Sequence, residues 1–182
     1  MTLFLGHAPW VAGLDEAGMV KVVQGFAAER AEALVAAYRR ARPEATPHDI
    51  VYRIAGDQGV RLPSLTIAER KLAQGAAPVF VYLFTFETNV LGGRLKSPHT
   101  LEIPFVFDTV AVSPLTGDAP GRPALAKAMS RAWIAFARNG RPDHASIPSW
   151  PRYNTGERPT MIFDRECRIE NDPFGAERRA WE

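Results

Sequence analysis

The stretch VFVYLFTFETNVLGGRLKSPHTLEIPFVF, residues 79–107, holds the clearest structural pattern of the sequence. Residues 78–86 are rich in Val, Phe and Tyr, and this pattern predicts a buried strand. A loop with glycine and proline follows and leads to His99, and the apolar run after it, residues 101–107, fits either a strand or a short helix. His99 thus follows the carboxyl end of a strand, where catalytic residues of α/β proteins gather, although a lone loop histidine is more often a surface or packing residue.

Outside this stretch the sequence is mostly helical in pattern. Apolar spacing, an N-cap threonine at Thr46 and a C-cap glycine at Gly140 mark the ends of several helices. We predict helices over residues 14–26, 29–41, 46–54, 63–73 and 123–139, and a second strand over residues 160–163. An α/β chain of this length normally shows several βαβ units, but this one shows only two strands. We therefore predict that the chain carries only the edge of a larger sheet and the helices that cover it.

Composition excludes several classes of protein. The chain has 182 residues, of which 46% are hydrophobic and 23% charged, and this excludes wholesale disorder. A net charge of +2 gives no field that would attract nucleic acid, and the single cysteine, Cys167, excludes a disulfide scaffold. The longest apolar stretch near the middle, residues 76–86, is too short to span a bilayer. We therefore predict neither a nucleic acid nor a membrane as a partner.

Motifs for the common catalytic chemistries are absent from the sequence. None of the six serines stands in the G-x-S-x-G elbow that presents the nucleophile of α/β-hydrolases. The four histidines form no H-E-x-x-H pattern, and no glycine-rich phosphate loop is present. We expect no metal and no cofactor.

The residues around His99 resemble a known family. Residues 79–107 are similar to the C-terminal part of the type B carboxylesterases, a serine-esterase branch of the α/β-hydrolase fold that includes the cholinesterases. In that family a strand leads to a loop with the catalytic histidine, and a motif H-x-x-[ED]-[IL]-P-[FY]-V-F follows; here it reads HTLEIPFVF at residues 99–107. Three further family signatures follow in order: WIAFARNGRP at residues 133–142, WPRY at residues 150–153 and TMIF at residues 160–163.

The resemblance implies an α/β fold in which residues 1–182 form the C-terminal third of a hydrolase domain, with helices and the edge strands of an incomplete central sheet. It implies that His99 is the catalytic histidine. The nucleophile elbow and the glycine-rich oxyanion loop belong to the family's N-terminal two-thirds, and this sequence contains neither. The family's acid precedes a run similar to TLFL, so we expect it just upstream of Met1; Glu16 is a rival that fits a helix start better. Glu102 is either a carboxylate that supports the histidine loop or a surface residue.

Three functions remain open at this point. The chain fits a fragment of a carboxylic ester hydrolase that supplies His99, acts on small carboxylic esters together with the N-terminal part of the same domain, and is inactive alone. It also fits a non-catalytic binding module, since some members of the family became adhesion proteins, or an orphan truncated product of an esterase gene. The intact motif at His99 argues against the binding module.

Overall fold

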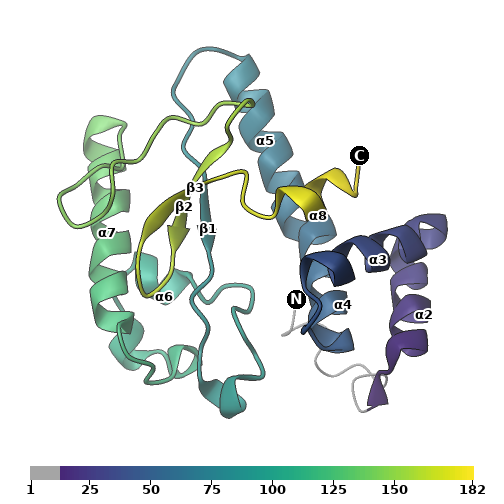
Figure 1. The fold of residues 1–182 in the computed structure, drawn as a ribbon. Coiled ribbons are helices and arrows are strands. Elements are labelled where there is room, and N and C mark those ends of the chain that lie inside the picture. Colours follow the sequence, from purple (N-terminus) through teal and green to yellow (C-terminus); the bar gives the residue numbers. More distant parts are fainter. Residues whose placement is uncertain (1–12) are drawn as a thin grey trace. The chain divides into compact units, whose positions relative to one another are not determined.

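The computed structural model describes residues 13–182, which divide into two compact units (Figure 1). Unit 1 contains the described residues up to Thr66 together with residues 174–182, and unit 2 contains residues 67–173. The chain therefore leaves unit 1, forms all of unit 2, and returns to unit 1 for its last nine residues.

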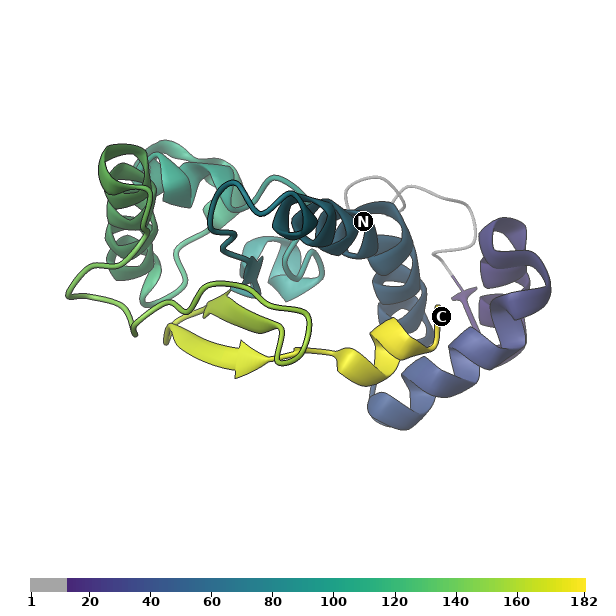
Figure 2. The same cartoon turned by 90° about the horizontal axis from the view of Figure 1, so that it is seen from above.

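Unit 1 is helical, as the sequence predicts for this region. Its elements are α2 (Glu16–Ala27), the 3-10 turn η2 (Ala28–Arg30), α3 (Ala31–Ala41), α4 (Pro47–Gly56), the π-helical turn η3 (Asp57–Arg61), the first residues of α5 (Leu62–Ala73), and α8 (Gly175–Arg179). Figure 2 shows α2 and α3 beside one another and α8 against α3. Their apolar faces form one core around Met19, Leu34, Tyr38, Ile50 and Ile54, all of which are buried.

The helix starts in unit 1 follow from local capping chemistry. Asp15 is the N-cap of α2, and its carboxylate accepts a hydrogen bond from the Gly18 N–H at 2.7 Å. Thr46 begins α4 in a reciprocal capping box with Asp49, in which each side chain accepts from the other residue's backbone N–H at 3.2 Å. The predicted N-cap at Thr46 is confirmed.

The region between α4 and α5 differs from our prediction. We expected two separate helices over residues 46–54 and 63–73, but the backbone stays helical from Pro47 to Ala73 through η3. Pro63 has no N–H to donate to the preceding turn, which is why the pattern looked like a helix start. The widened turn of η3 just before it, where the Leu62 N–H donates to the Asp57 carbonyl, keeps the helix continuous.

Unit 2 contains a three-stranded sheet in the order β1-β2-β3. Strand β1 (Tyr82–Phe84) runs parallel to β2 (Pro159–Phe163), with Leu83 opposite Ile162. Strand β3 (Arg168–Asn171) runs antiparallel to β2. Figure 1 shows the three strands side by side. Two segments distant in sequence, around residues 80 and 160, thus join to form the sheet, and β2 is buried along its whole length.

The sheet differs from prediction in two respects. The strand predicted over residues 78–86 forms regular pairing only over β1, because within the described residues it has a neighbour on one side alone. Single hydrogen bonds extend the contact at both ends, from the Met161 N–H to the Val81 carbonyl and from the Thr85 N–H to the Phe163 carbonyl. Strand β3 was not predicted, because its sequence RIEN is mostly polar.

The helices of unit 2 pack on this sheet. The 3-10 turn η4 (Val90–Gly93) precedes α6 (Ile103–Val106), and the turns η5 (Val110–Val112) and η6 (Pro114–Thr116) lie between α6 and α7 (Arg122–Asn139). The last residues of α5 also belong to this unit. The apolar run at residues 101–107 is therefore a short helix. The buried core of the unit includes Phe86, Leu101, Phe105, Met129 and Phe163.

Helix α7 confirms the helix predicted over residues 123–139 and begins one residue earlier. Gly140 ends the helix in the left-handed conformation, with φ 68°, as a C-cap glycine should. Leu125 and Met129 are buried, but Ile134 and Phe136 are about half exposed, at 47% and 48%. The apolar stripe of the helix is therefore covered in its first half and open to solvent in its last turns.

Candidate catalytic histidine

His99 lies in unit 2 on the segment that follows β1. The loop of residues 85–98, which we call the histidine loop, leads from the carboxyl end of β1 to His99 and contains η4. His99 is exposed, whereas Pro98 before it and Leu101 after it are buried. Two buried neighbours thus hold a solvent-accessible imidazole at the surface. This is the arrangement that a base needs if it is to meet a substrate or a second catalytic group.

The backbone beside His99 is unusual. Thr100 has φ 75°, a left-handed conformation that β-branched residues rarely adopt. Leu91 and Lys96 in the histidine loop also have positive φ, at 54° and 56°. Such conformations cost about 1–3 kcal/mol each and persist only where surrounding contacts enforce them. Strain of this kind concentrates at functional sites, which agrees with a functional histidine here.

Glu102 lies three residues beyond His99, at the N-terminal end of α6, where it occupies the N-cap position. Burial, and after it the negative charge of Glu102, raises the pKa of the Tyr82 hydroxyl on β1. The Glu102 carboxylate therefore acts on the region where the sheet meets α6. It is half-buried, so it is neither a core residue nor a fully solvated one.

Glu16 lies in unit 1, in the first turn of α2, where its carboxylate forms an ion pair with the Arg39 guanidinium of α3. Its side chain is 66% exposed. An acidic residue in the first turn is favourable because the helix dipole places partial positive charge there. These contacts suit the helix-start role that the sequence favoured for Glu16.

The serine nearest His99 in sequence is Ser97. Its Oγ donates a hydrogen bond to the Phe84 carbonyl at 3.4 Å, and it has no flanking glycines that would form an elbow. Ser97 therefore serves to tie the end of the histidine loop back to β1. It does not have the surroundings of an activated nucleophile.

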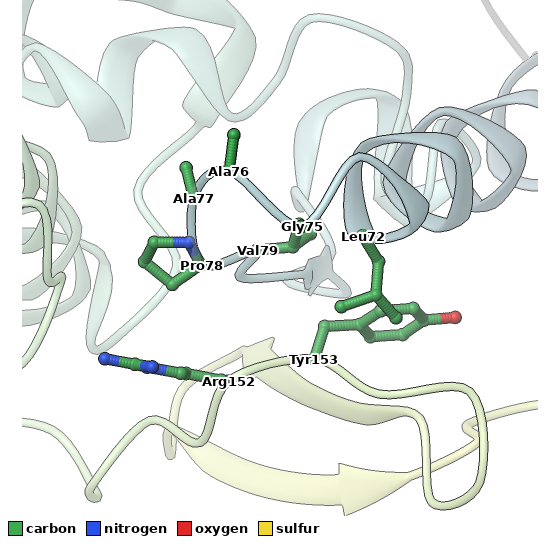
Figure 3. Close-up of a pocket in the computed structure, with 8 residues that line it drawn as sticks. All are labelled: Leu72, Gly75, Ala76, Ala77, Pro78, Val79, Arg152 and Tyr153. Carbon is green, nitrogen blue, oxygen red and sulfur yellow. The ribbon is translucent and has the colours of Figure 1, made fainter.

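A shallow hollow of about 350 Å³ lies elsewhere in unit 2, between the end of α5 and the segment before β2 (Figure 3). Leu72 lies beside the Tyr153 ring, the backbone of residues 75–79 forms another wall, and Arg152 extends in the other direction. This hollow adjoins the amino end of β1, whereas His99 follows the carboxyl end. Because ligand sites of α/β sheets lie at the carboxyl ends of strands, we do not identify the hollow as the active site.

Residues 13–182 contain neither a competing metal site nor a membrane-spanning helix. Nowhere in that range do three His, Cys, Asp or Glu side chains lie close enough to hold a metal ion. No helix of the described part combines the length and the apolar character that crossing a bilayer requires.

The single cysteine is not an activated nucleophile. Burial raises the pKa of the Cys167 thiol, which makes its reactive thiolate form less populated.

Comparison with known proteins gives a consistent result. The model of the carboxylesterase family matches residues 17–181. The para-nitrobenzyl esterase of Bacillus subtilis (strain 168) is 34% identical over 109 residues, which cover 57% of this chain and 21% of that enzyme. The phenmedipham hydrolase of Pseudarthrobacter oxydans is 25% identical over 128 residues, or 66% of this chain and 25% of that enzyme.

The structural comparison covers the whole chain. A solved carboxylesterase of Geobacillus stearothermophilus superimposes with a TM-score of 0.83 and 33% identity, over 100% of this chain and 38% of that one. The chain thus spans between about a fifth and two fifths of the length of these relatives. Its elements adopt the α/β-hydrolase fold of the carboxylesterases. Since the family model matches nearly all of the sequence, the chain belongs to the carboxylesterase family.

Proposed function

We propose that residues 1–182 are the C-terminal third of a carboxylic ester hydrolase and that His99 is its catalytic histidine. The observation that carries the proposal is the place of His99: it is exposed on the loop beyond the carboxyl end of β1, within the sequence HTLEIPFVF. Membership of the carboxylesterase family supports small carboxylic esters as the substrate class.

In the proposed reaction His99 moves one proton back and forth. A serine hydroxyl, supplied by the N-terminal part of the same hydrolase domain, attacks the ester carbonyl carbon while the His99 imidazole takes its proton. The tetrahedral intermediate then collapses, the C–O bond to the alcohol breaks, and His99 gives the proton to the departing oxygen. Water repeats the sequence on the acyl-serine and releases the acid.

The same proposal makes the chain inactive alone. None of its six serines stands in a nucleophile elbow, so His99 has no activated hydroxyl to deprotonate. In this proposal a residue other than Glu16 supplies the carboxylate that orients the histidine, because the charge of Glu16 is already paired with Arg39. Glu102 supports the histidine from the start of α6 rather than acting in the proton transfer.

The test combines this chain with a nucleophile. The chain is expressed alone and together with the part of the Geobacillus stearothermophilus carboxylesterase that it leaves unmatched, and hydrolysis of p-nitrophenyl acetate is followed. We expect turnover only from the combination, and a loss of about a thousandfold or more in His99→Gln. His48→Gln is the matched control and should retain activity. Hydrolysis by the chain alone that depends on His99 would contradict the proposal that the nucleophilic serine comes from the N-terminal part of the domain.

The mass of the native polypeptide tests whether these 182 residues are part of a longer protein. If the protein captured from its source cells is much heavier than the 20.1 kDa of this chain, the remainder should contain a G-x-S-x-G elbow. A native mass of 20.1 kDa would instead favour a binding module or a truncated product.

A further inference from the structure

The histidine loop is held by a buried threonine that the sequence did not single out. Thr88 is only 1% exposed, and its polar contacts reach both its own loop and a distant segment. Its hydroxyl donates to the Leu115 carbonyl at 2.8 Å and accepts from the Val90 N–H at 3.2 Å. Its own N–H donates to the Lys96 carbonyl at 3.0 Å, so one residue closes the loop on itself and fastens it to the segment around η6.

Asn89 makes a second connection between the same two segments. Its Oδ1 accepts from the Asp118 N–H at 3.2 Å, and its Nδ2 donates to the Asp118 carboxylate. A Cβ at Gly117 would collide with Asn89 Oδ1, so a side chain at this position would displace that of Asn89. Gly117 also has φ 61°. The approach of the two segments is therefore close and depends on Gly117 as well as on the hydrogen bonds.

The segment that receives these bonds is itself fixed to a long helix. Arg122, in the first turn of α7, donates from Nη1 to the Val110 carbonyl at 3.1 Å, to the Thr116 hydroxyl at 2.9 Å and to the Gly117 carbonyl. Thr116 is fully buried, and its hydroxyl lies 3.0 Å from the Val110 carbonyl oxygen. Hydrogen bonds thus fasten residues 110–118 to α7 on one side and to Thr88 and Asn89 of the histidine loop on the other.

We propose that Thr88, assisted by Asn89, is a positioning residue for His99: its hydroxyl fastens the strained histidine loop to the α7 side of unit 2 and so fixes where the imidazole stands. The proposal rests on the function proposed above for His99. The positive φ angles of Leu91, Lys96 and Thr100 support it, because a loop in these conformations relaxes when its anchors are removed. Thr88 does not itself take part in proton transfer.

The test substitutes the hydroxyl and follows the loop without using catalysis. Thr88→Val keeps the shape and removes both side-chain hydrogen bonds, Thr88→Ser restores them, and Thr160→Val is the control. Thr160 is also buried, at 4% exposure, and donates to the Arg158 carbonyl at 3.0 Å, but it lies on β2. Hydrogen–deuterium exchange by mass spectrometry reports the amides of the histidine loop. Exchange at the imidazole C2 carbon, compared at one fixed pH, reports the surroundings of each histidine ring.

We expect Thr88→Val to accelerate amide exchange of residues 90–96 by about tenfold, the size of one lost buried hydrogen bond. The C2 exchange rate of His99 should change as well, while the rates of His48 and His144 stay unchanged. Thr88→Ser should behave as the unsubstituted chain, and Thr160→Val should leave the histidine loop as it was.

A second variant keeps the test decisive if Thr88→Val does not fold. Asn89 is exposed, so Asn89→Ala should fold and produce the same selective loosening of the loop to a smaller extent. If every one of these two variants that folds leaves the loop and His99 unchanged, the proposal is wrong.

These readouts separate the proposal from the function on which it rests. In the combination that hydrolyses esters, Thr88→Val should lower kcat with little change in KM, and Thr88→Ser should restore it. If Thr88→Val loosens the loop but His99→Gln does not affect hydrolysis, Thr88 anchors the loop and His99 is not the catalytic histidine. If hydrolysis depends on His99 but Thr88→Val does not loosen the loop, His99 is catalytic and Thr88 does not position it.

Discussion

At the scale of single residues, Thr100 stores strain next to the proposed catalytic histidine. Because its φ of 75° is unfavourable for a β-branched residue, Thr100→Gly should raise the free energy of unfolding by about 1 kcal/mol, even though glycine loses more backbone entropy on folding. Urea denaturation measures the change. Thr109→Gly is the matched control, since Thr109 has an ordinary φ of −111° and the same substitution there should lower stability. Destabilisation by Thr100→Gly would mean that its side chain contributes contacts that outweigh the strain.

Tyr38 joins three segments of unit 1 through its hydroxyl. It donates to the Asp57 carboxylate at 2.5 Å and accepts from the Trp181 indole N–H at 2.9 Å. Tyr38→Phe leaves both partners without this hydroxyl, so we expect a loss of about 1–3 kcal/mol in the stability of unit 1. Thermal denaturation of the two chains side by side at pH 7 measures it.

Tyr38 should also make the free energy of unfolding depend on pH in the alkaline range. Burial, together with the charge of Asp57, raises the pKa of the Tyr38 hydroxyl far above its usual value of 10. The folded chain therefore holds this proton more tightly than the unfolded chain. The resulting stability is fully present below about pH 10 and falls as the pH rises above it. In Tyr38→Phe the decline above pH 10 should be shallower, and equal slopes for the two chains would contradict this assignment.

At the scale of elements, the capping box at the start of α4 gives a sharp prediction. Thr46→Ala removes the oxygen that accepts from the Asp49 N–H, so the free energy of unfolding should fall by about 1 kcal/mol. Thr46→Ser retains the oxygen and should retain most of the stability. A loss that is the same for both substitutions would indicate that the methyl group, rather than the cap, is responsible.

Elements with local signals were predicted well, and elements fixed by distant partners were not. Thr46 and Gly140 mark helix ends through contacts within a few residues, so the sequence contains the information directly. Strand β3 has a polar sequence and exists because β2 lies beside it, and η3 keeps a helix intact across a proline that normally begins one. The strand before His99 was predicted too long because sequence alone does not show how far its partner extends.

The candidate site divides in the same way. His99 was identified from a continuous motif, HTLEIPFVF, which a sequence displays completely. Thr88 was missed because its main contact, Leu115, lies 27 residues away and only the folded chain brings them together. A threonine in a loop is an ordinary residue in sequence, and the burial of Thr88 is the signal that distinguishes it.

At the scale of the whole molecule, the last nine residues belong to a unit whose other residues come from the start of the described chain. The Phe174 ring lies under the guanidinium of Arg42 at 4.5 Å, and the Arg30 guanidinium donates to the Ala180 carbonyl. Removing residues 174–182 should therefore loosen unit 1 and leave unit 2 folded. Hydrogen–deuterium exchange should rise across α2, α3 and α4 and stay unchanged across the sheet. A uniform rise in both units would show that they unfold together.

This return of the chain also sets an order of events during synthesis. The ribosome makes most of unit 1 first, then all of unit 2, and only afterwards the segment that closes unit 1. At roughly 5–20 residues per second, several seconds separate α4 from its partners at the C-terminal end. During that interval the arginines that will surround Phe174, and the tyrosine that will meet Trp181, stand without them. Unit 1 can therefore be completed only after every residue of unit 2 has been synthesised.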